Sequence, residues 1–225
     1  MINFKIILNV LGYLLIALSL VMLIPVIIDL GMGNDTWKSF ITSAIITFGF
    51  GVTFLISTRN EENNKILMQD AFLITSLSWL SISIFGALPF YFSESGLNIT
   101  NSVFESMSGI TTTGATVISS LDGLPESILF YRQLLQWMGG MGLIVLAIAV
   151  MPLLGIGGGQ IYKTEVPGAM GEQRLTPRIK ETAQALWLIY FGLTTICGVL
   201  YYLNGMSAFD AISHAMSTVA IGGFS

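Results

Sequence analysis

The amino-acid sequence predicts an all-α polytopic membrane protein in which units of helix, re-entrant pore loop and helix are repeated. Of its 225 residues, 53% are hydrophobic and only 10% are charged, whereas soluble domains carry about 25% charged residues. Apolar runs of transmembrane length recur along the chain. A Met-Ser pair followed by a short run rich in Thr or Gly occurs twice, each time after a segment too short to cross a bilayer.

Five segments are apolar over roughly the 20 residues that a membrane-spanning helix needs. They cover residues 6–30, 40–56, 71–92, 128–154 and 182–203. The first is apolar for too long to be the core of a signal peptide. The second is short, so it either extends toward Trp37 or lies tilted.

The distribution of lysine and arginine predicts a cytoplasmic N-terminus. In that orientation only Lys38 and Arg132 lie outside, which follows the positive-inside rule. The residues placed inside are Lys5, Arg59, Lys65, Lys163, Arg174, Arg178 and Lys180. Residues 93–127 must then begin and end outside, so they cannot contain a complete span. Their moderately apolar part, 100–110, predicts a re-entrant segment that is buried in protein or lines a water-filled path.

A shift of 109 residues aligns NSVFESMSGITTTGAT (101–116) with DAISHAMSTVAIGGFS (210–225) without a gap. The alignment pairs Met107 with Met216 and Gly114 with Gly223, and it predicts two repeats that run in the same direction. The second repeat reaches Ser225 before any returning helix. We therefore expect the chain to be a fragment, because a terminus inside a buried loop would leave backbone groups unsatisfied.

The two runs have the chemistry of a carbonyl-lined cation site. A small cation in a low-dielectric interior needs oxygens that replace its water, and loops after the pore helices of potassium channels supply backbone carbonyls. Glycine takes a positive φ readily, and the C-terminal end of a helix favours a cation. Neither run contains Asp or Glu, so a monovalent ion is expected rather than calcium. The predicted filter residues are Thr111, Thr112, Thr113, Gly114, Ala220, Ile221, Gly222 and Gly223.

Other polar residues and glycines have simpler interpretations. Arg132 is expected to snorkel to the outer interface, and His214 to form a hydrogen bond behind the filter rather than bind a metal. Gly139, Gly140 and Gly142 are expected to allow close helix packing rather than act as a hinge. A group of acids is interpreted as solvated loop acids or acids at helix starts, with attraction of cations as the alternative: Glu94, Glu105, Asp122, Glu126 and Asp210.

Composition and motifs exclude several function classes. The formal net charge of −4 leaves no basic face for phosphates, so no nucleic acid is expected as a partner. No nucleophile, acid–base pair or cluster of metal ligands stands out, so neither an enzyme nor a bound cofactor is expected. The GIGGG stretch at 155–159 follows a membrane helix rather than a strand. A flexible helix end is therefore favoured over a phosphate-binding loop.

The order of spans, pore helices and the runs TTTGAT and AIGGFS resembles the Trk/Ktr/HKT superfamily of potassium transporters. The stretch LLQWMGGMGLIVLAIAVMPLLGIGGGQIYKTEVPG (134–168) is similar to the bacterial TrkH branch. The resemblance covers essentially the whole chain. It implies potassium uptake across the bacterial plasma (inner) membrane through a filter that four repeats build around one pore. Potassium is then the transported ligand, and the filter positions carry over to 111–114 and 220–223.

The resemblance also implies a domain organisation and partners. Residues 1–60 would form two additional N-terminal transmembrane helices, 71–154 the first repeat, 155–181 a cytoplasmic loop and 182–225 an incomplete second repeat. In the lipid bilayer the subunit is expected to be a homodimer that binds cytosolic nucleotide-binding regulatory subunits, with the basic loop 163–180 as one candidate contact. The alternatives are a secondary transporter with broken helices for another small solute and a non-conducting membrane scaffold.

Overall fold

The computed structural model of the chain describes residues 2–59, 68–93, 95–121, 123–150 and 175–225. Within these ranges the regular elements are all α-helices, which confirms the predicted all-α class. The helices are α1 (Phe4–Val21), α2 (Leu23–Met32), α3 (Trp37–Ser57), α4 (Met68–Gly86), α5 (Leu88–Phe92), α6 (Ile99–Ile110), α7 (Glu126–Val150), α9 (Leu175–Leu203) and α10 (Ala208–Val219).

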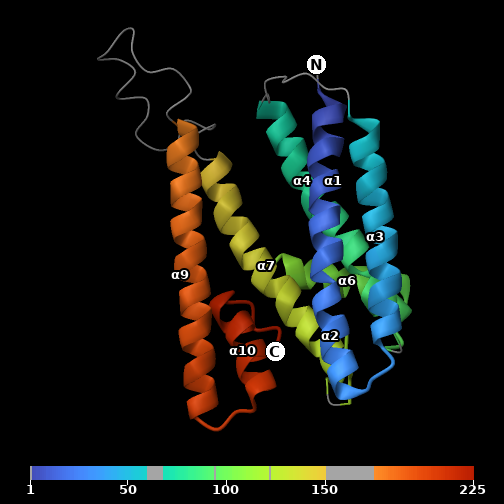
Figure 1. Ribbon diagram of the computed structural model, residues 1–225, viewed down its shortest axis with the longest axis vertical. Coiled ribbons are helices and arrows are strands. Elements are labelled where there is room, and N and C mark those ends of the chain that lie inside the picture. Colours follow the sequence, from blue (N-terminus) through green and yellow to red (C-terminus); the bar gives the residue numbers. More distant parts are fainter. Residues whose placement is uncertain (1, 60–67, 94, 122, 151–174) are drawn as a thin grey trace.

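The long helices alternate in direction, so the chain returns repeatedly to the same two ends of the bundle (Figure 1). The start of α1, the end of α3 and the starts of α4 and α9 lie at one end. The α2–α3 turn and the connection from α9 to α10 lie at the opposite end (Figure 1). Helix α7 crosses obliquely and contacts α6, α9 and α10. It is therefore the element through which the two halves of the bundle meet.

Four of the five predicted spans match helices that are long and apolar enough to cross a membrane. Among the described residues these are Phe4–Met32, Trp37–Ser57, Gln69–Phe92 and Glu181–Leu203, and the second does extend to Trp37. The predicted span at 128–154 coincides with α7 as far as Val150, and its last residues lie outside the described ones. Helix α7 is not among the four because its side chains are described only as far as Gly142, which leaves too short a stretch to count as a span. Its first half carries polar residues that the fold buries against other helices.

Two of these spans consist of two helical pieces because each contains a proline. Pro25 has no N–H to donate to the carbonyl of Val21, and α1 gives way to α2 around Met22. Pro89 likewise cannot donate to Phe85, and α4 gives way to α5 at Ala87. A hydropathy pattern does not contain these breaks, because both pieces stay apolar.

The core that fixes the start of α7 is aromatic and centred on Tyr131. The rings of Phe40 from α3 and Phe90 from α5 each lie 5.3 Å from the Tyr131 ring. The Tyr131 hydroxyl donates a hydrogen bond of 3.1 Å to the carbonyl of Gly86 at the end of α4. Leu18 of α1 packs in the same buried cluster. Helices α1, α3, α4 and α5 therefore hold the first turns of α7 in a fixed place.

Helices α1 and α3 approach each other closely where two glycines face one another. A Cβ added to Gly51 would lie 2.8 Å from Cγ1 of Ile16 and 3.0 Å from the carbonyl oxygen of Gly12. Small residues at such a crossing let helix backbones pack directly, which is a main source of helix association in a bilayer.

We expect Gly51→Leu to lower the stability of the folded protein by about 1–3 kcal/mol, because the added side chain overpacks the α1–α3 crossing. Gly49 lies on the same helix with open space around it, so Gly49→Leu is the matched control and should unfold like the wild type. Thermal unfolding midpoints in detergent compare the two variants. Equal midpoints for both would contradict the close crossing.

Candidate functional site

The two short helices α6 and α10 are built alike at the spacing that the sequence repeat predicts. They start at residues 99 and 208 and end at residues 110 and 219. The side chain of Asn98 caps α6 by accepting a hydrogen bond from the backbone N–H of Asn101. Ser207 caps α10 in the same way from Asp210. The repeat therefore holds for local structure, down to the position of the capping residue.

Each helix runs into a loop with an alternating backbone, and we call residues 111–114 the first loop and 220–223 the second loop. Thr112 and Gly114 have φ of 55° and 74°, and Ile221 and Gly223 have φ of 59° and 63°. Thr113 and Gly222 between them are not in the left-handed region. The two loops therefore repeat the same order of backbone conformations, with a positive φ at the second and fourth residue of each.

The first loop is held by its own helix. Ser108 donates a hydrogen bond of 2.5 Å to the carbonyl of Ala115, and its own carbonyl accepts from the N–H of Thr113 at 3.0 Å. The hydroxyls of Thr111 and Thr113 are 2.8 Å apart. These bonds offset the cost of about 1–2 kcal/mol that a β-branched residue bears in the left-handed conformation of Thr112.

The two loops meet at their glycines. A Cβ added to Gly114 would lie 1.7 Å from the carbonyl oxygen of Gly222. Only glycine allows this approach, and only glycine adopts the φ of 74° at position 114 without strain. The structure therefore brings the two sequence-predicted runs together, and it places the C-terminal ends of α6 and α10 next to the same point.

Helix α7 packs against the ends of both short helices through two glycines. A Cβ on Gly139 would lie 1.8 Å from the carbonyl oxygen of Ile110, and one on Gly140 would lie 3.3 Å from Cα of Ala220. The close-packing interpretation is confirmed for these two residues. At Gly142 a Cβ would meet only Trp79, at an ordinary 4.0 Å.

Two glutamines of α7 hold the end of the second loop, and sequence reasoning missed both. The Oε1 atom of Gln136 accepts hydrogen bonds from the hydroxyl of Ser217 at 2.6 Å and from the N–H of Phe224 at 3.3 Å. The side-chain amide of Gln133 donates to the carbonyl of Phe224 at 2.9 Å. A signal was present in the sequence, because polar residues inside an otherwise apolar membrane helix mark functional positions.

The structure corrects the expectations for Glu105 and Arg132. Neither is solvated, since their side chains are 0% and 1% exposed, and Nε of Arg132 donates to Oε1 of Glu105 at 2.8 Å. Glu105 also accepts hydrogen bonds from the hydroxyl of Thr116 at 2.8 Å and from the N–H of Val117 at 3.1 Å. Arg132 does not snorkel because it finds a buried carboxylate. Glu105 thus holds the segment that follows the first loop.

The remaining acids behave as predicted where the structure describes them. Asp210 accepts from the Ser207 hydroxyl at 2.7 Å at the start of α10, and Glu126 accepts from Asn34 at 2.9 Å in the first turn of α7. Glu94 and Asp122 lie outside the described residues. The His214 ring lies edge-on to the ring of Tyr201, with 6.5 Å between their centroids. Its expected hydrogen bond behind the filter stays a prediction.

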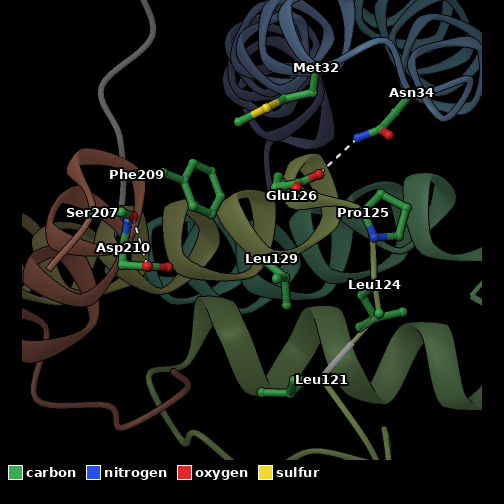
Figure 2. A pocket seen from close by; sticks show the side chains of 11 residues that line it. Met32, Asn34, Leu121, Leu124, Pro125, Glu126, Leu129, Ser207, Phe209 and Asp210 are labelled. Atoms are coloured by element: carbon green, nitrogen blue, oxygen red, sulfur yellow. Dashed lines mark hydrogen bonds between the residues drawn. The ribbon is translucent and has the colours of Figure 1, made fainter.

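A pocket of about 630 Å³ lies at the end of the bundle that carries the α2–α3 turn (Figure 2). Residues from the end of α2, the start of α7 and the start of α10 line it, including Met32, Asn34, Pro125, Glu126, Phe209 and Asp210. The two carboxylates in this wall are those that already accept hydrogen bonds from Asn34 and Ser207 (Figure 2). In the described part of the chain, no group of three or more His, Cys, Asp or Glu side chains is arranged to hold a metal ion.

Comparisons with known proteins give one family. Residues 37–225 match the TrkH family, described as cation transport proteins. The Trk system potassium uptake proteins TrkH of Halomonas elongata and Escherichia coli K12 are 48% and 46% identical to this chain over 224 residues, which is 99% of the chain and 46% of each relative. The chain therefore spans about half the length of the curated relatives it matches.

A solved structure agrees with this assignment. The crystal structure of the potassium transporter TrkH from Vibrio parahaemolyticus matches with a TM-score of 0.86 and 43% sequence identity. The match covers 100% of this chain and 44% of that one.

We expect Gly114→Ala to destabilise the protein far more than Gly96→Ala. Both glycines have a positive φ, of 74° and 70°, so both variants bear a backbone cost of about 1 kcal/mol. Only at Gly114 does the new methyl group also meet the Gly222 carbonyl, whereas nothing lies within 4 Å at Gly96. Thermal unfolding midpoints measure the difference, and equal midpoints would contradict the contact between the loops.

Proposed function

The chain belongs to the TrkH family of cation transport proteins, and on that premise we propose that it forms part of a potassium uptake pathway across the bacterial plasma (inner) membrane. The observation that carries the proposal is the meeting of the two loops at Gly114 and Gly222. Two equivalent loops with alternating backbone conformations supply two walls of one carbonyl-lined site. Potassium loses its water there and gains backbone oxygens.

The filter residues in this proposal are Thr111 to Gly114 and Ala220 to Gly223. The remaining walls come from two further repeats, as in the family pattern, so that residues 71–154 and 182–225 are the first two of four units. The described contacts support this division, since α6 packs against α4 and α10 packs against α9, the long helix that precedes each of them. Residues 1–60 then serve as additional helices that brace the first unit, through the contacts of α1 with α4 and of α3 with α5.

The charges around the loops favour a monovalent ion. Neither loop contains a carboxylate, and Glu105, which binds Thr116 just after the first loop, is neutralised by Arg132. The loops therefore offer neutral carbonyl dipoles and the C-terminal ends of two helices. These attract potassium, whereas calcium sites in proteins are built with carboxylates.

The lipid bilayer is the surrounding partner in this proposal. Along α9 many large apolar side chains are exposed, with Leu188 and Leu203 at 75% and 73%, as a helix facing lipid or another apolar helix requires. The wider assembly follows the family resemblance, with a homodimer and cytosolic nucleotide-binding regulatory subunits. A secondary transporter with broken helices remains the rival. It is disfavoured because such transporters often use inverted repeats, whereas these two repeats run in the same direction.

Rubidium uptake into proteoliposomes that contain the whole gene product tests the transport proposal. Unlabelled potassium should suppress uptake strongly and sodium only weakly. Gly223→Ser should shrink this preference, because position 223 has a φ of 63° that a side chain strains. Gly205→Ser is the matched control, since Gly205 has a φ of 97° in open space outside the loop. It should keep the wild-type preference.

Two other outcomes of this experiment oppose the proposal. No rubidium uptake by the wild type would favour the scaffold. Uptake that Gly223→Ser leaves unchanged would favour a transporter whose ion path avoids the second loop.

Single cysteines test the proposed cytoplasmic N-terminus. Lys38 and Arg59 are exposed at opposite ends of α3. In a Cys197→Ala background, we expect Lys38→Cys to react with a membrane-impermeant maleimide on intact cells, and Arg59→Cys to react only after permeabilisation. The reverse labelling pattern would invert the proposed topology.

A further inference from the structure

The side chain of Arg132 contacts residues that adjoin or hold both loops. Nε of Arg132 donates to Glu105 at 2.8 Å, and Glu105 holds Thr116 and Val117 just after the first loop. The guanidinium carbon of Arg132 lies 4.0 Å from the centroid of the Phe224 ring. Phe224 directly follows the second loop. Arg132 therefore contacts one residue that holds the first loop and one residue next to the second loop.

Stability alone does not explain this buried ion pair. Removing two charges from water costs several kcal/mol per ion, and apolar side chains of similar volume are often equally stable or better. Nη1 of Arg132 is also buried with no hydrogen-bond partner in the described part of the chain, which adds to the cost. The ion pair therefore has a role other than stabilising the fold.

The geometry of the guanidinium suggests that role. Its N–H groups point outward in one plane, while its face stacks on aromatic rings, and the two directions are fixed relative to each other. The position of Glu105 therefore sets the orientation in which the guanidinium face of Arg132 packs against the Phe224 ring. Phe224 is joined to Gly223 by a peptide bond, and Gln133 and Gln136 bind the Phe224 backbone. A displacement of the Phe224 ring is therefore transmitted to Gly223 in the second loop.

The arrangement belongs to the first repeat. The repeat places His214 where Glu105 lies, and His214 packs against Tyr201 of α9. The second repeat therefore does not repeat the Glu105 carboxylate, and the contact through Arg132 starts from the first loop and ends at the second.

We propose that Arg132 is a positioning residue that couples the two loops, so that a displacement of one changes the ion preference of the other. This inference rests on the proposed function, because it concerns the selectivity of the proposed filter. Arg132 itself touches no transported ion. It acts through Glu105 on the first loop and through Phe224 on the second.

A double-mutant cycle on selectivity tests the coupling in the whole gene product. Thr116→Val removes a hydrogen bond to Glu105 without leaving a charge unpaired, and Phe224→Leu removes the ring face. The readout is the sodium concentration that halves rubidium uptake divided by the potassium concentration that does so. We expect the effect of the double variant to differ from the product of the single effects by about threefold or more, as for residues in one network.

The cycle is repeated in the Arg132→Lys background. Lysine keeps the charge but lacks the planar fork and face, so the two effects should become multiplicative there. Multiplicative effects with Arg132 present would overturn the proposal, and so would coupling that persists in Arg132→Lys. Phe224→Met serves the same cycle if Phe224→Leu does not fold.

Two controls separate this inference from the proposed function. Lys38→Gln breaks an ion pair of 2.7 Å whose side chains are 63% and 86% exposed, and it should leave the selectivity ratio unchanged. A wild type without potassium preference would refute the proposed function itself. A selective wild type whose ratio neither single substitution alters would refute the coupling alone.

Discussion

The backbones of the two loops touch at Gly114 and Gly222, and this contact limits what can lie around it. No side chain fits between the loops, so the short helices that carry them must end at the same place. Helix α7 must then pass both helix ends at backbone distance, which requires Gly139 and Gly140. Main-chain atoms therefore dominate the centre of the site, and side chains act from behind it.

Those side chains are polar although the second half of the same helix is apolar. A buried polar group costs free energy unless it is bonded, and Gln133 and Gln136 recover that cost by binding backbone groups around Phe224. Both loops are also braced from their own helices, because the carbonyls of Ser108 and Ser217 accept from the N–H groups of Thr113 and Gly222. The loops differ in what holds the residues that follow them, which is Glu105 of α6 after the first loop and the two glutamines of α7 after the second.

Local signals account for what the sequence predicts well. Span positions follow hydropathy, and the matching bounds of α6 and α10 follow from the caps Asn98 and Ser207 and from the glycines of the repeat. These features depend on neighbouring residues, so they can be read along the chain. The loop residues are likewise brought together as the repeat predicts, while their role in binding potassium stays a proposal.

The tertiary contacts could not be read in that way. Glu105 and Arg132 are 27 residues apart, and each alone resembles an acid or base near a membrane interface. Only the packing of α6 against α7 brings them together and removes water from both. The polar residues of α7 were visible in the sequence, but their partner Phe224 lies 91 and 88 residues beyond Gln133 and Gln136.

The polarity of α7 also constrains how the protein is made. A helix that carries an arginine and two glutamines beyond its first turn enters lipid poorly when it is alone. Its arginine becomes compatible with the bilayer once Glu105 is beside it, and Glu105 belongs to a helix synthesised earlier. We therefore expect stable insertion of α7 to depend on α6 being already in place, so that these two helices enter the membrane together rather than one by one.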